Sequence, residues 1–492
     1  MNIYLVIGAF GDGGITTAMF NRAAMFNDAG HDCTILHLDY RPDFDAYIAD
    51  LRKHGRLRAD IAIKNPYTEL MKAATTSTAV VRHDAATAYR SGPMGEGIVR
   101  YSTADDRPLK KATFDSESRL RALDTYTDVE GDYSHAEYST AGWKELESTF
   151  TGGTVTEEHY FTPDGKTYLI RQMDPGTGAQ AAIQPFGPGQ KALYKNNTAW
   201  HTAWFEQLAA THDEKPVFIC DGPGSAAKVI NIKPGVAGKA IALHNVHFSG
   251  TEFKPGQPFR ESSSFLKRIN NFDALVVLTD EQAEDVALDI GNRDKMFVIP
   301  NSLQASPVPD VTRDPLRIST FGKLISPKGT DNAIRAFQLV LKKLPDATLN
   351  IFGMGSQRDT LANLAASLGI AHRVTLHGYT HEPSVEMAKA SAVVFPSKAE
   401  AWGFTIAESL LNETPVVAFE CKYGPGDLIE DGTDGYLVPP GDIAAMADRL
   451  VHILENPAQA RTMGASGRQK IEATYTGGPL MERWEKMFAS IV

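Results

Sequence analysis

The chain has 492 residues, which at ~150 residues per domain predicts roughly three domains. Its 49 Lys and Arg against 60 Asp and Glu give a formal net charge of −11, which argues against a protein that coats nucleic acid through bulk positive charge. Hydrophobic residues at 42% and charged residues at 22% are close to globular averages, so long disordered tracts are not expected.

Cysteine usage and apolar runs bear on the compartment. Cys33, Cys220 and Cys421 lie far apart with no paired spacing, which predicts neither a disulfide scaffold nor a zinc site and favours a reducing compartment. The apolar run at the start is short and opens onto glycines, so it indicates a strand and not a signal peptide. No stretch approaches the ~20 apolar residues of a membrane span. We expect a cytoplasmic protein, with at most peripheral contact at the inner face of the membrane.

The first elements follow a βαβ pattern. A short apolar run at Ile3–Ile7 predicts a strand, a glycine-rich turn and a helical pattern from Thr16 to about Gly30 follow, and Cys33–Leu38 predicts a second strand. Short buried strands that alternate with helices indicate a parallel sheet with right-handed crossovers.

From about Met94 to Lys195 this rhythm breaks. Polar runs dotted with aromatic residues, such as Thr154–Phe161 and Lys166–Gln172, are joined by the turn signal Pro163-Asp164-Gly165 and predict an antiparallel β insertion. Residues 91–200 hold 11 Lys or Arg and 16 Asp or Glu, a net of 11 − 16 = −5. The insertion is therefore not a polyanion-binding surface on average, and we expect an architectural or partner-facing role.

The α/β rhythm then returns and completes the first sheet, and after a segment rich in Pro and polar residues, Gln304–Pro315, a second alternation begins. The predicted fold is α/β, with two doubly wound Rossmann-like domains facing a cleft and an antiparallel β insertion in the first. The predicted boundaries are 1–75 and 205–305 for the first domain, 76–204 for the insertion, 306–470 for the second domain, and 471–492 for a helix that crosses back to the first.

The turn Gly11-Asp-Gly-Gly14 lies between a strand and a helix, where backbone N–H groups could approach an anion. It has neither the spacing G-x-G-x-x-G nor the phosphate-loop Gly-Lys-Ser/Thr, so neither nicotinamide binding nor a P-loop is supported. A merely tight βα turn is the alternative.

Charged side chains follow two strands of the second alternation. Lys323 and Lys328 lie in the turn after one strand, where both ammonium groups could reach one anionic ligand, although two solvated surface lysines would look the same in isolation. Glu400 follows another strand and Glu408 lies about one turn into the next helix, a pair of carboxylates that could hold sugar hydroxyls. Between them, the backbone of Trp402-Gly403-Phe404 would aim N–H groups at a phosphate or sugar.

The second half of the chain resembles the retaining glycosyltransferases of family 4, which have the two-domain GT-B fold. The resemblance rests on a set of short motifs: Gly322-Lys323 with Lys328-Gly329, Phe352-Gly353-x-Gly355, His377-Gly378 and the Glu400-x7-Glu408 pair.

The resemblance implies roles for these residues. Lys323 and Lys328 would grip the nucleotide diphosphate, Glu400 would contact the donor sugar, and Glu408 would bind the ribose. The family usually has arginine at the first cation, so Lys323 would supply a point charge without bidentate geometry. Backbone around Tyr379 would read the base, and backbone N–H groups of Gly13 and Gly14 would contact the β-phosphate.

A histidine in the loop after a strand of the first domain is expected to contact the donor near the reacting carbon, again by resemblance. His244 and His247 both lie in such a loop. We slightly favour His247 because it lies deeper in the loop, while His244 could equally be a strand-end residue that packs locally. With Lys328 and Glu400, these histidines are the candidate catalytic residues. A zinc site is not supported, since no further ligand cluster accompanies them.

Asp43-Phe-Asp45 invites a metal-binding interpretation. It follows the second strand of the first domain, away from the donor-binding half, so a solvated loop is the better interpretation. The lysines can neutralise charge on the leaving diphosphate. We therefore expect no metal and no other cofactor.

A narrower resemblance rests on Lys422-Tyr-Gly-Pro-Gly-Asp427-Leu-Ile-Glu-Asp-Gly432 and on the β insertion. It indicates the branch with poly(glycerol-phosphate) α-glucosyltransferases, poly(ribitol-phosphate) α-N-acetylglucosaminyltransferases and the enzymes that begin glycosylation of serine-rich adhesins. The implied reaction moves glucose or N-acetylglucosamine, with retention, from a UDP-sugar to a hydroxyl of wall teichoic acid.

Two alternatives stay open: O-glycosylation of a serine-rich adhesin, and a non-catalytic partner of another glycosyltransferase. Partners implied by the resemblance are the UDP-sugar, a polymer or protein acceptor, and further copies (a trimer) or a non-catalytic partner bound through the insertion. The sequence does not decide between the two donor sugars.

Overall fold

The computed structural model describes residues 1–11, 13–81, 97–102, 105, 107–187, 192–250 and 253–492. Asp12 of the glycine-rich turn and Met94, where the break in rhythm was expected, lie outside the described residues. Within the described residues the strands form three sheets, of which the first and third are parallel and the second is antiparallel. The expected fold class is confirmed.

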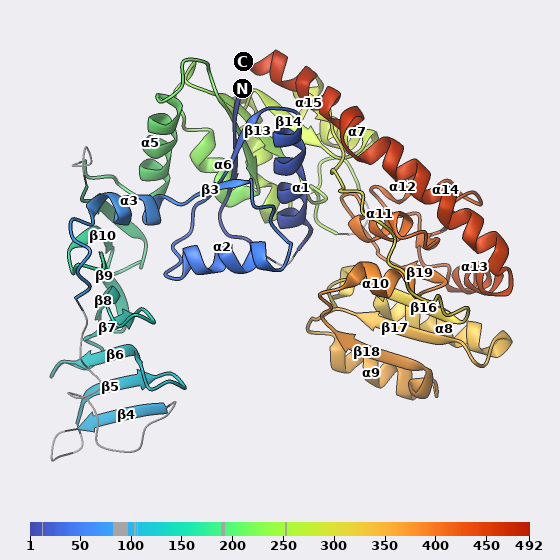
Figure 1. The fold of residues 1–492 in the computed structure, drawn as a ribbon, viewed down its shortest axis with the longest axis horizontal. Coiled ribbons are helices and arrows are strands. Elements are labelled where there is room, and N and C mark those ends of the chain that lie inside the picture. Colours follow the sequence, from blue (N-terminus) through green and yellow to red (C-terminus); the bar gives the residue numbers. More distant parts are fainter. Residues whose placement is uncertain (12, 82–96, 103–104, 106, 188–191, 251–252) are drawn as a thin grey trace.

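The first sheet has seven parallel strands with helices on both faces (Figure 1). In spatial order the strands are β15 (Met296–Val298), β14 (Ala274–Val277), β13 (Gly238–Ala242), β12 (Val217–Asp221), β1 (Asn2–Ile7), β2 (Asp32–His37) and β3 (Ala62–Lys64). The helices of this domain are α1 (Gly14–Asp28), α2 (Phe44–Lys53), α3 (Pro66–Ala74), α5 (Asn197–Ala209), α6 (Pro223–Val229) and α7 (Asp280–Ile290), with 3-10 segments at Glu261–Asn271 and Arg293–Lys295.

The sequence of β1 shows why both faces of this sheet are covered. Successive side chains of a strand point to opposite faces, and here both sets are apolar. Ile3 and Leu5 belong to one buried cluster, while Tyr4 and Val6 belong to a second one on the other face. A strand that is apolar on both sides is stable only between two layers of helices, which is the arrangement seen.

The insertion is an eight-stranded antiparallel meander in which each strand pairs with the next along the chain. Its strands are β4 (Gly97–Ser102), β5 (Pro108–Phe114), β6 (Leu120–Tyr126), β7 (Tyr133–Tyr138), β8 (Lys144–Thr151), β9 (Thr154–Phe161), β10 (Thr167–Met173) and β11 (Gln180–Pro185). The last strands pack on the first domain, because Tyr160 and Leu169 share a buried cluster with Tyr67 of α3 and Trp200 of α5.

The third sheet has six parallel strands in the order β18 (Val374–Gly378), β17 (Thr348–Phe352), β16 (Arg317–Phe321), β19 (Ala392–Phe395), β20 (Val416–Phe419) and β21 (Gly435–Val438). Its helices are α8 (Thr330–Lys343), α9 (Arg358–Ser367), α10 (Pro383–Ala388), α11 (Phe404–Leu411), α12 (Pro425–Leu428), α13 (Ile443–Glu455) and α14 (Pro457–Tyr475), with 3-10 segments at Ser326–Lys328 and Ala371–Arg373. The insertion and this second α/β domain extend from different sides of the first domain (Figure 1).

The chain ends in α15 (Gly478–Ile491), which returns from the second domain to the first (Figure 1). Trp484 and Phe488 of α15 join the buried cluster of α1, and the ring of Trp484 meets that of Phe26 edge-on at 5.2 Å between centroids. The backbone oxygen of Ile491 also accepts a hydrogen bond from Lys215 at 2.8 Å. The two α/β domains are therefore joined twice, by the linker after β15 and by this helix.

Candidate active site

Two loops at the carboxyl edge of the third sheet carry the predicted lysines and glutamates. β16 and β19 are neighbours, but the strands that follow each of them lie on opposite sides, which makes their carboxyl ends the switch point of the sheet where ligands of such folds bind. Lys328 in the loop after β16 forms an ion pair with Glu400 in the loop after β19, 72 residues later. The structure thus brings two predicted site residues into direct contact.

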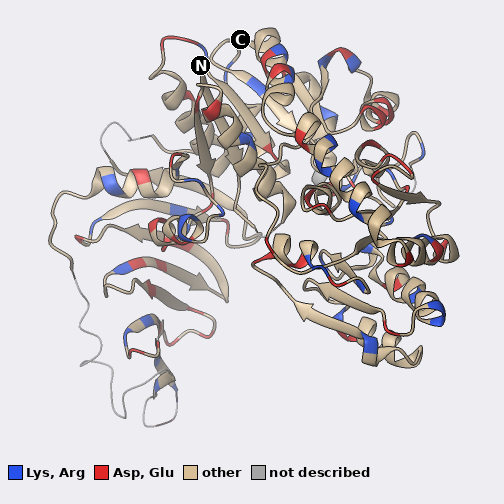
Figure 2. Ribbon diagram, turned by 45° about the vertical axis from the view of Figure 1, so that its right-hand side comes forward, with Lys and Arg blue, Asp and Glu red and all other residues tan. Residues whose placement is uncertain are grey.

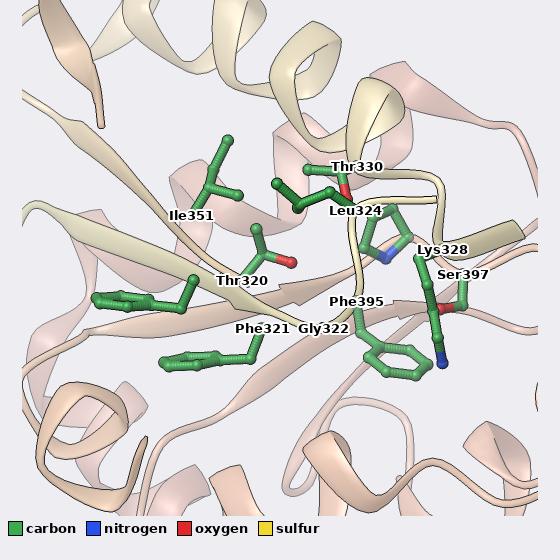
Figure 3. A pocket seen from close by; sticks show the side chains of 11 residues that line it. Thr320, Phe321, Gly322, Leu324, Lys328, Thr330, Ile351, Phe395 and Ser397 are labelled. Atoms are coloured by element: carbon green, nitrogen blue, oxygen red, sulfur yellow. The ribbon is translucent and has the colours of Figure 1, made fainter. Parts of the chain in front are cut away.

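A pocket of about 260 Å³, part of it open to solvent, lies at this switch point (Figure 3). Thr320, Lys328 and Ser397 contribute polar groups to its lining, and Phe321, Phe352 and Phe395 form an apolar wall. Lys323 lies in the same loop as Lys328 and is exposed. The pocket therefore combines the cationic side chain of Lys328 with an aromatic wall, and a second lysine lies exposed in the same loop, a combination suited to a phosphorylated ligand that carries a ring.

Glycines allow the loops to approach one another this closely. At Gly329, where φ is +63°, a Cβ atom would lie 2.0 Å from the backbone oxygen of Pro396. At Gly353, where φ is +148°, a Cβ would lie 1.8 Å from the backbone oxygen of Gly322. A side chain at Gly329 would push apart the two loops that hold the ion pair, and a side chain at Gly353 would push the loop after β17 away from the loop after β16.

The segment after Glu400 is a buried turn that leads into α11. The side chain of Trp402 is 1% exposed and packs against the rings of Phe404 and Tyr475, at 5.2 and 5.4 Å between centroids. Of the predicted donor contacts in this turn, Trp402 can therefore contribute its backbone but not its indole ring. Gly403 precedes the first residue of α11, Phe404, so the free N–H groups of this helix end face the loop.

Glu408 lies in the second turn of α11 and is partly buried. Burial raises the pKa of its carboxyl group to about 7. A buried carboxyl group has few hydrogen bonds to water, so its oxygens could accept hydrogen bonds from a ligand hydroxyl.

Tyr379 directly follows β18, the edge strand two places from β16, and is 47% exposed. The rings of Phe321, Phe352 and His377 stack along the carboxyl edge, with centroid separations of 4.9 and 4.5 Å. Gly378 between His377 and Tyr379 has a φ of +83°, a turn that glycine adopts without strain. Tyr379 is accessible, which the predicted contact with a base requires.

Gly13 and Gly14 of the first domain reach the same region. Gly13 caps the N-terminus of α1, and Gly14 is the first residue of that helix. A Cβ atom at Gly14 would lie 3.1 Å from Cδ2 of Phe404, so the N-terminus of α1 adjoins the N-terminus of α11 from the second domain. Two helix ends with free N–H groups thus meet at the start of α11, in the segment that follows Glu400.

The structure separates the two candidate histidines. His244 follows β13, and its Nε2 atom pairs with Asp221, the last residue of β12, which also forms an ion pair with Arg22 of α1. Burial alone would raise the pKa of Asp221, but Arg22 and His244 together hold it below its ordinary value. This chain of Arg22, Asp221 and His244 lies at the carboxyl edge of the first sheet, and the spacing of these residues in the sequence does not reveal it.

His247 is 0% exposed, and its Nε2 atom lies 3.1 Å from Oδ2 of Asp289 on α7. The rings of Phe248, Phe253 and Phe259 surround it, and burial lowers its pKa. A closed position among aromatic rings leaves the imidazole no face for a donor. The side chain of His244 is also only 4% exposed, so burial does not choose between the two; the choice of His244 over His247, which the sequence slightly favoured, stays a prediction that rests on the pairing of His244 with Asp221.

The residues of the rejected metal motif take part in surface ion pairs. Asp43 pairs with Arg41 at 2.8 Å and Asp45 with Lys72 at 2.9 Å. Cys33, Cys220 and Cys421 are free and buried. Within the part of the chain that the structure describes, no cluster of three or more His, Cys, Asp or Glu could hold a metal ion, and no helix is both long and apolar enough to cross a membrane.

The chain is similar in sequence to known glycosyltransferases. Residues 308–470 match the family described as Glycosyl transferases group 1. Over 489 residues the chain is 26% identical to a poly(ribitol-phosphate) alpha-N-acetylglucosaminyltransferase of Staphylococcus aureus, covering 97% of each chain. It is 22% identical over 514 residues to a poly(glycerol-phosphate) alpha-glucosyltransferase of Bacillus subtilis, covering 98% of this chain and 74% of the relative.

Among solved structures, a point mutant of S. aureus TarM, in complex with Fondaparinux, alpha-GlcNAc-glycerol and UDP, aligns with a TM-score of 0.78 at 23% identity over 99% of both chains. The two facing α/β domains and the site at their junction define a GT-B fold. The second domain, over residues 308–470, matches the group 1 glycosyltransferase family, and the chain as a whole is similar to sugar-transferring enzymes.

Proposed function

We propose that this chain is a retaining glycosyltransferase that moves glucose or N-acetylglucosamine from a UDP-sugar to a hydroxyl of wall teichoic acid, a poly(polyol-phosphate). The observation that carries the proposal is the Lys328–Glu400 pair at the switch point of a group 1 glycosyltransferase domain. The similarity to the S. aureus enzyme, which spans 97% of both chains and so includes the insertion, supports the acceptor class.

The donor is held mainly by the second domain in this proposal. Lys323 and Lys328 neutralise the diphosphate, and Glu400, relieved of its pairing with Lys328 by the phosphate charge, accepts hydrogen bonds from sugar hydroxyls. Glu408 accepts hydrogen bonds from the ribose. Backbone near Tyr379 contacts the base, and the protein itself supplies the positive charge, so that no metal is required.

The first domain contributes the groups near the bond that breaks. Gly13 and Gly14 present backbone N–H groups to the β-phosphate, where negative charge develops as the sugar departs. His244 approaches the donor near the anomeric carbon, and Asp221 fixes the orientation of its ring. Arg22 keeps Asp221 ionised and is itself almost entirely buried, so this arrangement is rigid before the donor arrives.

Transfer with retention needs no covalent nucleophile in this account. The bond from the anomeric carbon to the β-phosphate oxygen breaks, and the acceptor hydroxyl attacks from the same face. Its proton passes to the departing phosphate, and the new glycosidic bond forms with the original configuration. The enzyme contributes position, electrostatics and the exclusion of water between the two domains.

The insertion faces the acceptor or a partner in this proposal. Lys and Arg are interspersed with Asp and Glu along its strands (Figure 2), in keeping with its net charge of −5 from 11 cationic and 16 anionic residues between 91 and 200. Recognition of a polyanion therefore depends on a local arrangement of cations and not on bulk charge. Assembly with further copies or with a non-catalytic partner through the insertion, and work at the cytoplasmic face of the membrane, belong to the same proposal.

A panel of sugar nucleotides tests the donor, followed by a panel of acceptors. The protein should release UDP slowly from UDP-glucose or UDP-N-acetylglucosamine, and addition of poly(ribitol-phosphate) or poly(glycerol-phosphate) should accelerate release and yield a glycosylated polymer. Acceleration by serine-rich peptide alone would replace teichoic acid with a protein acceptor. Absence of UDP release with every donor would favour a non-catalytic partner.

A further inference from the structure

The backbone of Glu400 is paired with a second segment of the same domain. The N–H of Glu400 donates to the backbone oxygen of Lys422 at 2.8 Å, and the N–H of Tyr423 donates to the backbone oxygen of Glu400. Lys422 and Tyr423 follow β20, the strand next to β19. Because the N–H and the carbonyl of Glu400 are both bonded to this segment, a shift of Lys422 and Tyr423 would also shift Glu400.

Lys422 and Tyr423 also cross to the first domain. The hydroxyl of Tyr423 donates to Oδ2 of Asp285 on α7 at 2.7 Å, and the Lys422 ammonium reaches the same oxygen at 2.6 Å. Asp285 is 6% exposed and Tyr423 is 0% exposed. Lys422 makes another contact, at 3.1 Å, with Glu281, whose side chain is 52% exposed.

Apolar packing joins the same junction to the histidine loop. Tyr423 shares a buried cluster with Val246 and Phe248, which lie in the loop that begins with His244. The rings of Phe248 and Tyr423 meet edge-on at 6.3 Å between centroids. One turn along α7 from Asp285, Asp289 holds His247 of that loop. A single helix of the first domain thus anchors both the segment behind Glu400 and the loop that carries His244.

The two acidic contacts of Lys422 differ in how much they stabilise the junction, because one is exposed and the other is buried. Exposed ion pairs contribute little because water and salt screen them, so the contact with Glu281 has a small effect. A buried carboxylate that accepts hydrogen bonds from both an ammonium and a phenol is different, since losing its charge leaves the remaining groups poorly compensated. Asp285 is therefore the anchor of this junction.

We propose that Asp285 is a positioning residue which, through Lys422 and Tyr423, holds Glu400 of the donor site in register with the His244 side of the first domain. The catalytic part of this inference rests on the proposed function, because the register matters when a donor bound by one domain reacts beside the other. Misplacement of reacting groups by about 1 Å can cost on the order of 10²-fold in rate.

Two substitutions and a matched control test the proposal kinetically. Asp285→Asn keeps the shape but removes the charge, and Tyr423→Phe removes only the hydroxyl, while Glu281→Gln removes the exposed contact of the same lysine. We expect kcat to fall about 10-fold or more in Asp285→Asn, less in Tyr423→Phe, and by less than about twofold in Glu281→Gln. The Kd for UDP, measured by calorimetry, should stay within about twofold of the parent value in all three, because the second domain supplies most donor contacts.

Hydrogen exchange gives a readout that does not depend on activity. Peptides covering residues 396–404 should exchange faster in Asp285→Asn and Tyr423→Phe, while peptides from β16 to β18 and all peptides of Glu281→Gln should keep the parent rates. If the parent transfers no sugar, the proposed function fails and the exchange pattern alone decides on the junction. If Asp285→Asn does not fold, Tyr423→Phe decides.

Three results would overturn the inference. The first is turnover within about twofold of the parent in both Asp285→Asn and Tyr423→Phe. The second is unchanged exchange over residues 396–404. The third is a loss of UDP affinity that matches the loss of kcat and accompanies a general loss of stability, since that pattern describes a structural residue without a positioning role.

Discussion

Glu408 offers a test in which stability and binding change in opposite directions. Its pKa lies at about 7, above the ordinary value of 4.5, because the fold buries the carboxyl group. The folded protein therefore holds this proton more tightly than the unfolded chain, and the free energy of unfolding falls as the pH rises from about 4.5 to about 7. A shift of this size corresponds to roughly 3 kcal/mol at pH 8, at 1.36 kcal/mol per pH unit.

Glu408→Gln removes this titration while keeping the size of the side chain. Urea denaturation between pH 5 and 8 should show nearly equal stabilities at pH 5 and a variant that is more stable than the parent by up to roughly 3 kcal/mol at pH 8. Because an amide replaces the carboxylate proposed to bind the ribose, the Kd for UDP at pH 8 should rise about 10-fold. A stability difference that does not change with pH, or UDP affinity equal to that of the parent, would refute the reasoning.

Other substitutions and conditions test the site piece by piece. Lys328→Ala should lower kcat about 10²-fold or more, measured as UDP release in the presence of acceptor, because one pre-organised charge contact is lost; near-normal turnover would remove Lys328 from the donor site. His244→Ala should lower kcat far more than it lowers the melting temperature, whereas His247→Ala should lower the melting temperature by several degrees as it opens a buried, hydrogen-bonded position. The opposite pattern would return His247 to the reaction. Activity should survive exhaustive chelation, and its loss would show that a metal takes part.

The donor loops were predictable because the sequence patterns that indicate them are local. Lys328 and Glu400 each follow a short apolar strand, and the carboxyl ends of parallel strands share one edge of a sheet, so their contact follows from two independent patterns. The β insertion was predictable for a similar reason, since Thr154–Phe161 and the turn after it have the pattern of a β-hairpin. Thr154–Phe161 forms β9 as expected.

Contacts that depend on packing could not be predicted. In the sequence, Arg22 lies within a largely apolar helix and Asp221 at the end of an apolar strand, and neither position indicates a partner. In the structure the two side chains, 199 residues apart in the chain, form an ion pair, and Asp221 also pairs with His244. The packing of Phe248 against Tyr423, which holds the loop that carries His244 and His247, joins two domains and is encoded by no short motif. The same holds for Asp285, whose partners come from another domain.

The most direct test of the central claim is transfer of labelled sugar from UDP-glucose or UDP-N-acetylglucosamine to a poly(polyol-phosphate), with the new linkage assigned by NMR, for the parent protein and Glu400→Gln side by side. We expect an α-linked product from the parent and a rate about 10²-fold lower in the variant. A β-linked product, equal rates in both proteins, or no transfer from either donor would contradict it.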